Sequence, residues 1–230
     1  MNDLTPPATP EPPFPPSAPP SRRPSPPTPP TPWTAAELAR ALRRPDELLE
    51  IVLGGPERLA LHAREGIGLA PLLRLLLVAA TLFAIPYGCV FGIAAWWKIA
   101  LLYLGSTLLC VPSLHVFATY LGLGVRLAPL LLLALALPAV AALFTAGFAP
   151  ILGFLKWTMG TASRGDSISW RDLSDWLLSA ALLAGVGQLW RCLAAAPFAR
   201  RSGGFAWLLA PWLLVFLYVL ARMATVLGLW

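Results

Sequence analysis

From residue 69 to residue 230 the chain is a series of long apolar stretches, separated by short breaks that carry charged residues, glycine or proline. Hydrophobic residues make up 57% of the chain and charged residues only 12%, about half the charged share of a typical soluble protein. A soluble fold does not need so much continuous hydrophobicity, whereas a segment that spans a bilayer must be apolar on every face. The sequence therefore predicts an all-α fold, a polytopic transmembrane helical bundle.

Charged residues bracket the predicted spans. Four uncharged stretches reach the length of about 20 residues that a bilayer core requires. The remaining stretch, which begins at Trp176, has only 15 uncharged residues before Arg191. It is accepted as a span because an arginine near a helix end can extend its charge to the headgroups. The five predicted spans are about 75–97, 99–120, 127–152, 176–196 and 202–221.

Prolines and small residues predict how these spans pack. An internal proline removes a backbone hydrogen-bond donor, so a neighbouring helix or a local rearrangement must satisfy the freed carbonyl. Small residues four positions apart let helix backbones approach closely, and the candidate pairs are Gly88 with Gly92 and Ala180 with Ala184. We expect a compact bundle whose spans are kinked at Pro86, Pro112, Pro138 and Pro211.

The first 33 residues form a proline-rich tail. Fifteen of the first 32 residues are proline, and proline lacks an amide donor and has a fixed φ angle. The tail is therefore expected to be disordered and extended. PxxP patterns beside Arg22 and Arg23 leave two interpretations open, a passive spacer, which we favour, and a docking site for a proline-binding protein partner.

Residues 34–68 are predicted to form a helical segment between the tail and the bundle, which is expected over residues 69–230. Thr34 and Glu37 have the spacing of a capping box, and Pro45 ends the short helix that they begin. Further short helices are expected over 46–53 and 57–65. Two interpretations stay open for this basic segment: it lies in the membrane interface, or it forms a solvated helical hairpin that binds a partner.

Charge predicts location and orientation. The net charge is +6. We interpret the excess of basic residues as groups that contact lipid headgroups and set the orientation in the membrane, and we expect no nucleic-acid partner. Lys and Arg near the span ends are more numerous on the N-terminal side, so the N terminus is expected in the cytoplasm and the C terminus outside. Abundant Arg, Ala, Leu and Pro indicate a bacterial genome rich in G and C, and hence a bacterial cytoplasmic membrane.

Three polar residues in the spans are the candidate functional groups: Ser113, His115 and Gln188. The string from Pro112 to His115 resembles one element of membrane phosphatidic-acid-phosphatase-type enzymes, but the other elements are missing. We expect no enzyme, no cofactor and no metal site. A structural hydrogen bond of His115, with Gln188 or with the backbone, is favoured over a proton relay.

Three stretches carry a resemblance to Yip1-type membrane proteins and their bacterial relatives: residues 101–123 (LLYLGSTLLCVPSLHVFATYLGL), the proline-bearing third span, and the ending LYVLARMATVLGLW. The acidic Asp-Leu-Tyr-Gly-Pro element of the eukaryotic members is absent. The resemblance implies a non-enzymatic membrane scaffold or adaptor. We expect such a protein to recruit partners through its cytoplasmic N-terminal region. The alternative is a small channel or transporter component. Besides the lipid bilayer, a protein partner of the tail and a homo-oligomer are left open.

Overall fold

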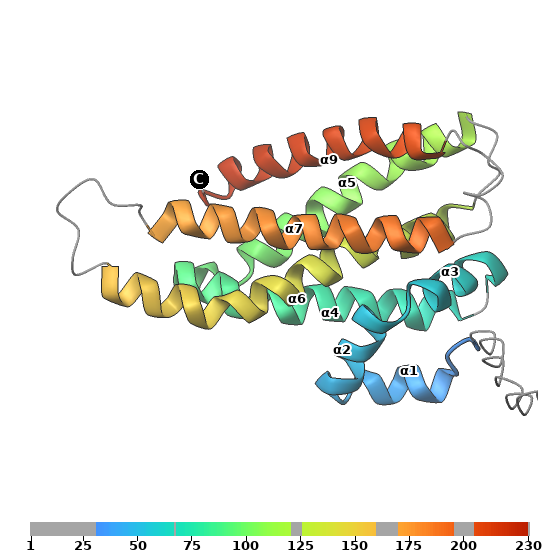
Figure 1. Cartoon of the computed structure of the whole chain (residues 1–230), viewed down its shortest axis with the longest axis horizontal. Coiled ribbons are helices and arrows are strands. Elements are labelled where there is room, and N and C mark those ends of the chain that lie inside the picture. Colours follow the sequence, from blue (N-terminus) through green and yellow to red (C-terminus); the bar gives the residue numbers. More distant parts are fainter. Residues whose placement is uncertain (1–30, 67, 121–125, 160–169, 196–204, 230) are drawn as a thin grey trace, which may run out of the picture.

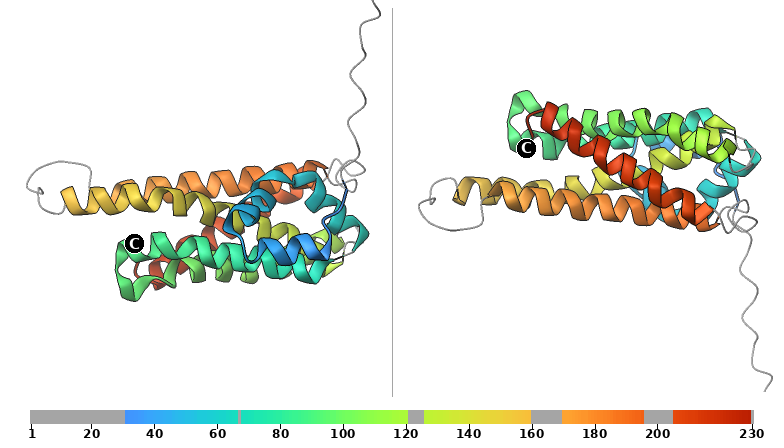
Figure 2. Two further views of the ribbon diagram at one scale, coloured as in Figure 1. Left: turned by 90° about the horizontal axis from the view of Figure 1, so that it is seen from below. Right: turned by 90° about the horizontal axis from the view of Figure 1, so that it is seen from above.

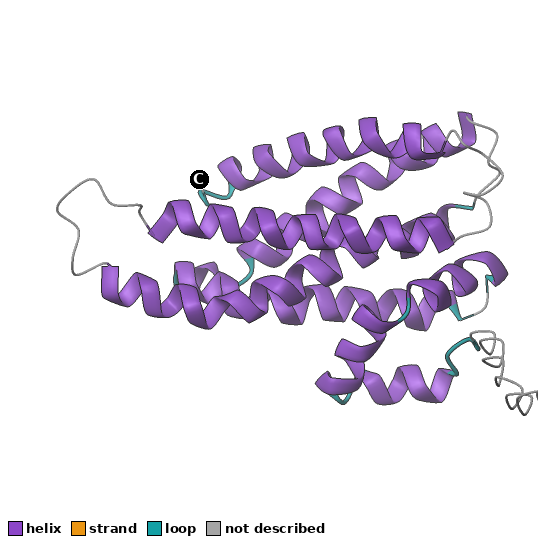
Figure 3. Ribbon diagram, viewed as in Figure 1, coloured by secondary structure: helices purple, strands orange, loops and turns teal. Residues whose placement is uncertain are grey.

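A computed structural model describes residues 31–66, 68–120, 126–159, 170–195 and 205–229. Within these ranges the chain forms helices joined by short turns, with no strand (Figure 3), as the sequence predicts. Nearly all of the proline-rich tail lies outside the described residues.

Three short helices precede the bundle: α1 (Ala35–Ala41), α2 (Pro45–Gly54) and α3 (Pro56–Glu65). The capping box that starts α1 is complete, because the Thr34 hydroxyl accepts from the Glu37 N–H at 3.3 Å and the Glu37 carboxylate accepts from the Thr34 N–H at 2.7 Å. Proline occupies the first position of α2 and of α3, where a missing N–H costs nothing. Gly66, with φ of 71°, ends α3 in the left-handed conformation that favours glycine.

Five long helices follow and alternate in direction (Figure 1): α4 (Leu69–Phe91), α5 (Lys98–Tyr120), α6 (Leu127–Met159), α7 (Trp170–Ala195) and α9 (Phe205–Val226). A 3-10 turn, η1 (Ile93–Ala95), lies between α4 and α5. We call the end at which α4 and α6 begin the proximal end, and the opposite end the distal end. The short helices α1–α3 lie beside the proximal part of the bundle (Figure 1).

Four helices in the described part of the chain are long and apolar enough to cross a membrane, which is the pattern of an integral membrane protein. They include α7, the stretch that looked too short in the sequence. In α9, the apolar helix among the residues with described side chains is shorter and runs over Ala210–Val226. Prolines lie within α4, α5, α6 and α9 without ending these helices; kinks at them stay a prediction.

The helix ends differ from the predicted span ends because charged residues do not terminate these helices. The first helix begins at Leu69 and includes Arg74, and it ends at Phe91 instead of residue 97. Its terminator is Gly92, whose φ of 143° lies outside the helical range. Lys156 likewise lies inside α6, and Arg191 lies inside α7.

Helix α6 is the centre of the packing. Its most extensive contacts are with α4 and α7, while α5 packs on α4, α6 and α9. Figure 2 shows α6 and α7 side by side, with α4, α5 and α9 grouped next to them. The largest fully buried side chains of the bundle are aromatic: Trp212, Tyr87, Tyr103 and Phe216.

The predicted small-residue contacts are realised at only some positions. Gly88 is buried, and a Cβ placed there would lie 2.5 Å from the carbonyl oxygen of Trp96, so this glycine permits a close approach. Gly92 ends α4 instead, and nothing lies within 4 Å of the position of its Cβ.

On α7 the contact is displaced by one residue from the predicted pair. Ala180 is exposed and Ala184 is half-buried, whereas Ala181 is fully buried. A Cβ on Gly185 would lie 2.6 Å from the carbonyl oxygen of Leu137 in α6. The close approach between the backbones of α6 and α7 therefore lies at Gly185, one residue after the predicted Ala184.

Candidate functional site: the N-terminal helices and the groove between them

Two of the predicted polar residues, Ser113 and His115, lie on α5. The Ser113 hydroxyl donates to the Cys110 carbonyl oxygen at 2.7 Å. The Trp212 indole N–H of α9 donates to the same oxygen at 2.9 Å, which joins α9 to α5. His115 is half-buried, and its Nδ1 atom is buried without a hydrogen-bond partner among the described residues.

Gln188 is not the partner of His115, which was one of the two hydrogen-bond partners that the sequence analysis proposed for that histidine. The Gln188 Nε2 donates at 3.4 Å to the carbonyl oxygen of Val52 in α2, and its Oε1 accepts at 3.4 Å from Arg191. The physical reason lies in the packing: α7 contacts α6 and α3, while α5 pairs with α9. The polar residue of α7 therefore links the bundle to the N-terminal helices.

Each of the three N-terminal helices packs on the bundle. Helix α1 contacts α4, α2 contacts α4 and α6, and α3 contacts α6 and α7. Apolar side chains fill these contacts, and each is at most 6% exposed: Leu38, Leu48, Ile51, Val52, Leu59 and Ala63. The segment 34–65 thus packs against the bundle, and both interpretations of this segment, in the membrane interface or as a hairpin that binds a partner, stay predictions.

His62 fixes the point at which the described chain enters α1. Its imidazole is 1% exposed, and its Nε2 accepts from the Trp33 backbone N–H at 3.0 Å. The two rings stack at 5.6 Å between centroids with planes 8° apart, and the Arg58 guanidinium lies 5.7 Å from the Trp33 ring. No sequence motif predicts this pair, because its two residues lie 29 positions apart.

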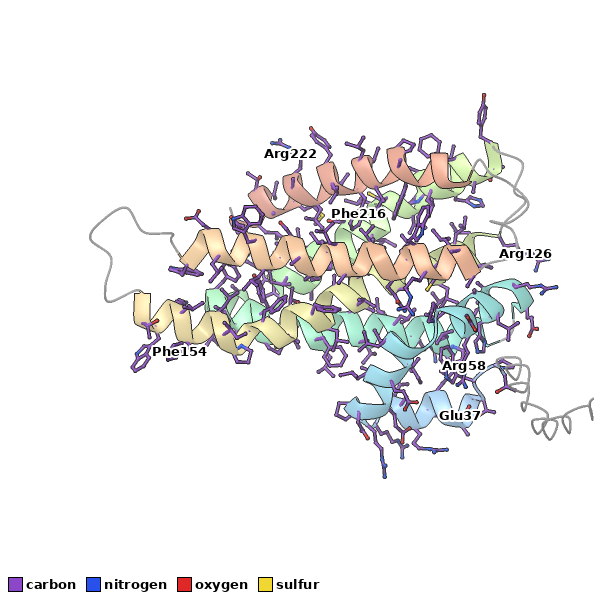
Figure 4. All side chains as sticks on the ribbon, viewed as in Figure 1. Glu37, Arg58, Arg126, Phe154, Phe216 and Arg222 are labelled. Atoms are coloured by element: carbon purple, nitrogen blue, oxygen red, sulfur yellow. The ribbon has the colours of Figure 1, made fainter. Side chains whose placement is uncertain are left out.

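A groove of about 430 Å³ opens between α1, α2 and α3 beside this contact. Three carboxylates, two guanidiniums and one indole give it a mixed charged and aromatic character. Figure 4 shows Glu37 and Arg58 on neighbouring N-terminal helices. The lining residues are Trp33, Glu37, Arg40, Glu47, Glu50, Ile51, Gly54 and Arg58.

The stability of α1, which forms one wall of the groove, depends on pH through Glu37. Hydrogen bonds from the backbone and side chain of Thr34 lower the pKa of the Glu37 carboxyl below its ordinary value. Because the folded pKa is the lower one, the stabilisation is present above the unfolded pKa, about 4.3, and is lost as pH falls through the folded value.

We therefore expect Thr34→Ala to loosen α1, because this change removes the hydroxyl that caps the helix and holds Glu37. The loss of an N-cap costs about 0.5–2 kcal/mol. Hydrogen exchange of the α1 amides at neutral pH measures the effect. Exchange should accelerate in Thr34→Ala, and Thr34→Ser should preserve the wild-type rate. Equal rates in all three proteins would contradict this role of the capping box.

Two lysines hold the distal end together. Lys98 donates to the Leu227 carbonyl oxygen, and Lys156 donates to the Val90 carbonyl oxygen. Cations at carbonyls near helix C-termini are stabilising because those groups carry partial negative charge. The Tyr87 hydroxyl also donates to the Ser174 carbonyl oxygen at 2.8 Å. These contacts assign a structural role to polar groups at the distal end.

Within the described residues, no three His, Cys, Asp or Glu side chains gather as metal ligands, and the three cysteines are free thiols. The groove between α1, α2 and α3 is therefore the polar site that the geometry brings forward. Comparison of the chain with protein-family models, curated proteins and solved structures gave no match.

Proposed function

We propose that the protein is a non-enzymatic membrane scaffold or adaptor that recruits protein partners through its N-terminal region. The observation that carries this proposal is the charged and aromatic groove. The groove lies on helices that pack against the bundle, next to the residue at which the tail joins α1. The resemblance to Yip1-type proteins points to the same role.

The packing of α1–α3 supports recruitment because it preorganises the groove. The buried leucines, the Gln188 bond to Val52 and the contact between Trp33 and His62 fix all three helices before a partner arrives. A surface that is already ordered loses less conformational entropy on binding. The bundle thus serves as an anchor, with a bacterial cytoplasmic membrane and a cytoplasmic N terminus as the proposed setting.

The lining suggests the chemistry of the partner. Glu37, Glu47 and Glu50 attract a basic segment, and the Trp33 ring offers a flat surface on which a cation or proline ring can pack. Arg40 and Arg58 repel basic side chains of the partner that lie beside them, and so favour one position of the segment along the groove. We therefore propose a basic peptide segment as the ligand, presented by another protein or by a second copy of this chain.

Copurification from native membranes tests the proposal. We expect full-length protein to retain partners that are reduced in Glu50→Lys, which reverses one exposed charge of the groove. Glu65→Lys is the matched control, because Glu65 is exposed on α3 but does not line the groove. A further variant lacking residues 1–31 separates recruitment by the tail from recruitment by the groove. Identical partner sets from all four proteins would overturn the proposal.

A further inference from the structure

A second groove lies on the side of the bundle, between α4, α5 and α6. It encloses about 240 Å³ and is open on one side. Its lining is leucine apart from one threonine and one arginine: Leu73, Arg74, Leu77, Leu104, Thr107, Leu108, Leu131 and Leu135. The Thr107 hydroxyl donates to the Tyr103 carbonyl oxygen at 2.8 Å, so the threonine is satisfied within its own helix.

Arg74 is the exception in this apolar lining. It lies five residues after the start of α4, about 7–8 Å along the helix. Its side chain is exposed, and no carboxylate of the described residues lies within 4.0 Å of it. An arginine at this depth in a spanning helix extends its guanidinium towards the headgroups, while its stem stays among apolar groups.

The walls of the groove continue onto a surface that faces lipid. Leu77 is 46% exposed and Leu108 is 66% exposed, as expected of side chains that meet acyl chains instead of water. The volume is smaller than that of a typical drug-sized pocket, about 300–1,000 Å³, so it accommodates part of one acyl chain and not a whole lipid.

We propose that this groove is a binding site for an anionic phospholipid, with the phosphate on Arg74 and one acyl chain against the leucines of α4, α5 and α6. Charge complementarity selects the occupant: the guanidinium matches a phosphate bidentately, and the leucines that line the groove match an acyl chain. The site does not depend on the proposed function, because its residues lie outside the N-terminal helices.

Native mass spectrometry of the full-length protein tests this site. The protein is purified in micelles with equal amounts of phosphatidylglycerol and phosphatidylcholine that carry the same acyl chains, and the retained lipids are counted. Wild type should prefer phosphatidylglycerol. Arg74→Gln should lower that preference about fivefold, the effect of one arginine near an anionic headgroup, while Arg74→Lys should retain part of it.

Two controls make the outcome decisive. Arg126 is exposed at the proximal end and does not line the groove (Figure 4); Arg126→Gln should keep the wild-type preference. Leu108→Trp fills the groove from its exposed side and should reduce retention of phosphatidylglycerol. The proposal is overturned if Arg74→Gln retains the preference, if Arg126→Gln loses as much, or if Leu108→Trp binds like wild type.

Discussion

Gly185→Ala should lower the thermal stability of the protein strongly, although the change adds a single methyl group. The new Cβ would lie 2.6 Å from the Leu137 carbonyl oxygen and 3.3 Å from the Ala141 Cβ, both in α6. A backbone oxygen has no rotamer with which to move away, so α6 and α7 must separate. Overpacking of this kind costs about 1–3 kcal/mol.

Gly187→Ala is the matched control for this prediction. Gly187 lies two residues further along α7, is exposed, and has nothing within 4 Å of its Cβ position. Glycine within a helix lowers stability by about 0.5–1 kcal/mol relative to alanine. The thermal stability of Gly187→Ala should therefore equal or exceed that of the wild type. The measurement is thermal unfolding of both purified variants by circular dichroism. Equal midpoints would show that α6 and α7 are not packed as described.

Gly88→Ala should have the second large effect, at the distal end of α4. Its Cβ would lie 2.5 Å from the Trp96 carbonyl oxygen and 2.9 Å from the Trp96 carbonyl carbon. These atoms belong to the turn that returns the chain from α4 to α5, so the turn must move away from α4. We expect a loss of about 1–3 kcal/mol by the same mechanism.

Gly147→Ala provides the comparison for Gly88→Ala, because Gly147 lies in α6 with nothing within 4 Å of its Cβ position. Detergent-solubilised protein heated before size-exclusion chromatography reports the fraction that stays folded. Gly88→Ala should disappear from the folded peak at a lower temperature than Gly147→Ala. If the two variants lose the folded peak together, the close approach between α4 and the turn is contradicted.

The N-terminal helices were predictable from sequence because local chemistry sets their ends. Thr34 and Glu37 make their bonds within four residues, and the prolines at 45 and 56 begin helices through their own fixed φ angles. Continuous hydrophobicity predicted the long apolar helices, four of which are long enough to cross a membrane. The predicted ends differ from the helix ends because Arg74 and Lys156 lie within helices.

Contacts between helices were much less predictable. Neighbouring residues on a helix point about 100° apart, so the choice between Ala180 and Ala181 depends on where α6 lies. Sequence offered several small-residue pairs of equal spacing and no means of ranking them. Gln188 was singled out as polar, but its partner at Val52 became visible only when α2 was placed against the bundle.

The groove itself had only partial signals in the sequence. The capping box marked Thr34 and Glu37, but nothing in the sequence placed the charged residues of α2 and α3 beside them. The role of His62 had no local signal, because its partner, Trp33, is 29 residues away. Only the tertiary structure shows that His62 is buried and stacked on Trp33, the last residue of the tail.

The central claim is that partners contact the groove between α1, α2 and α3. A photo-reactive amino acid placed at residue 50 of the full-length protein, in native membranes, tests that contact directly. The claim predicts a crosslinked partner from position 50 and none from position 65, which is also exposed but lies outside the groove. The same products from both positions, or products from position 65 alone, would contradict it.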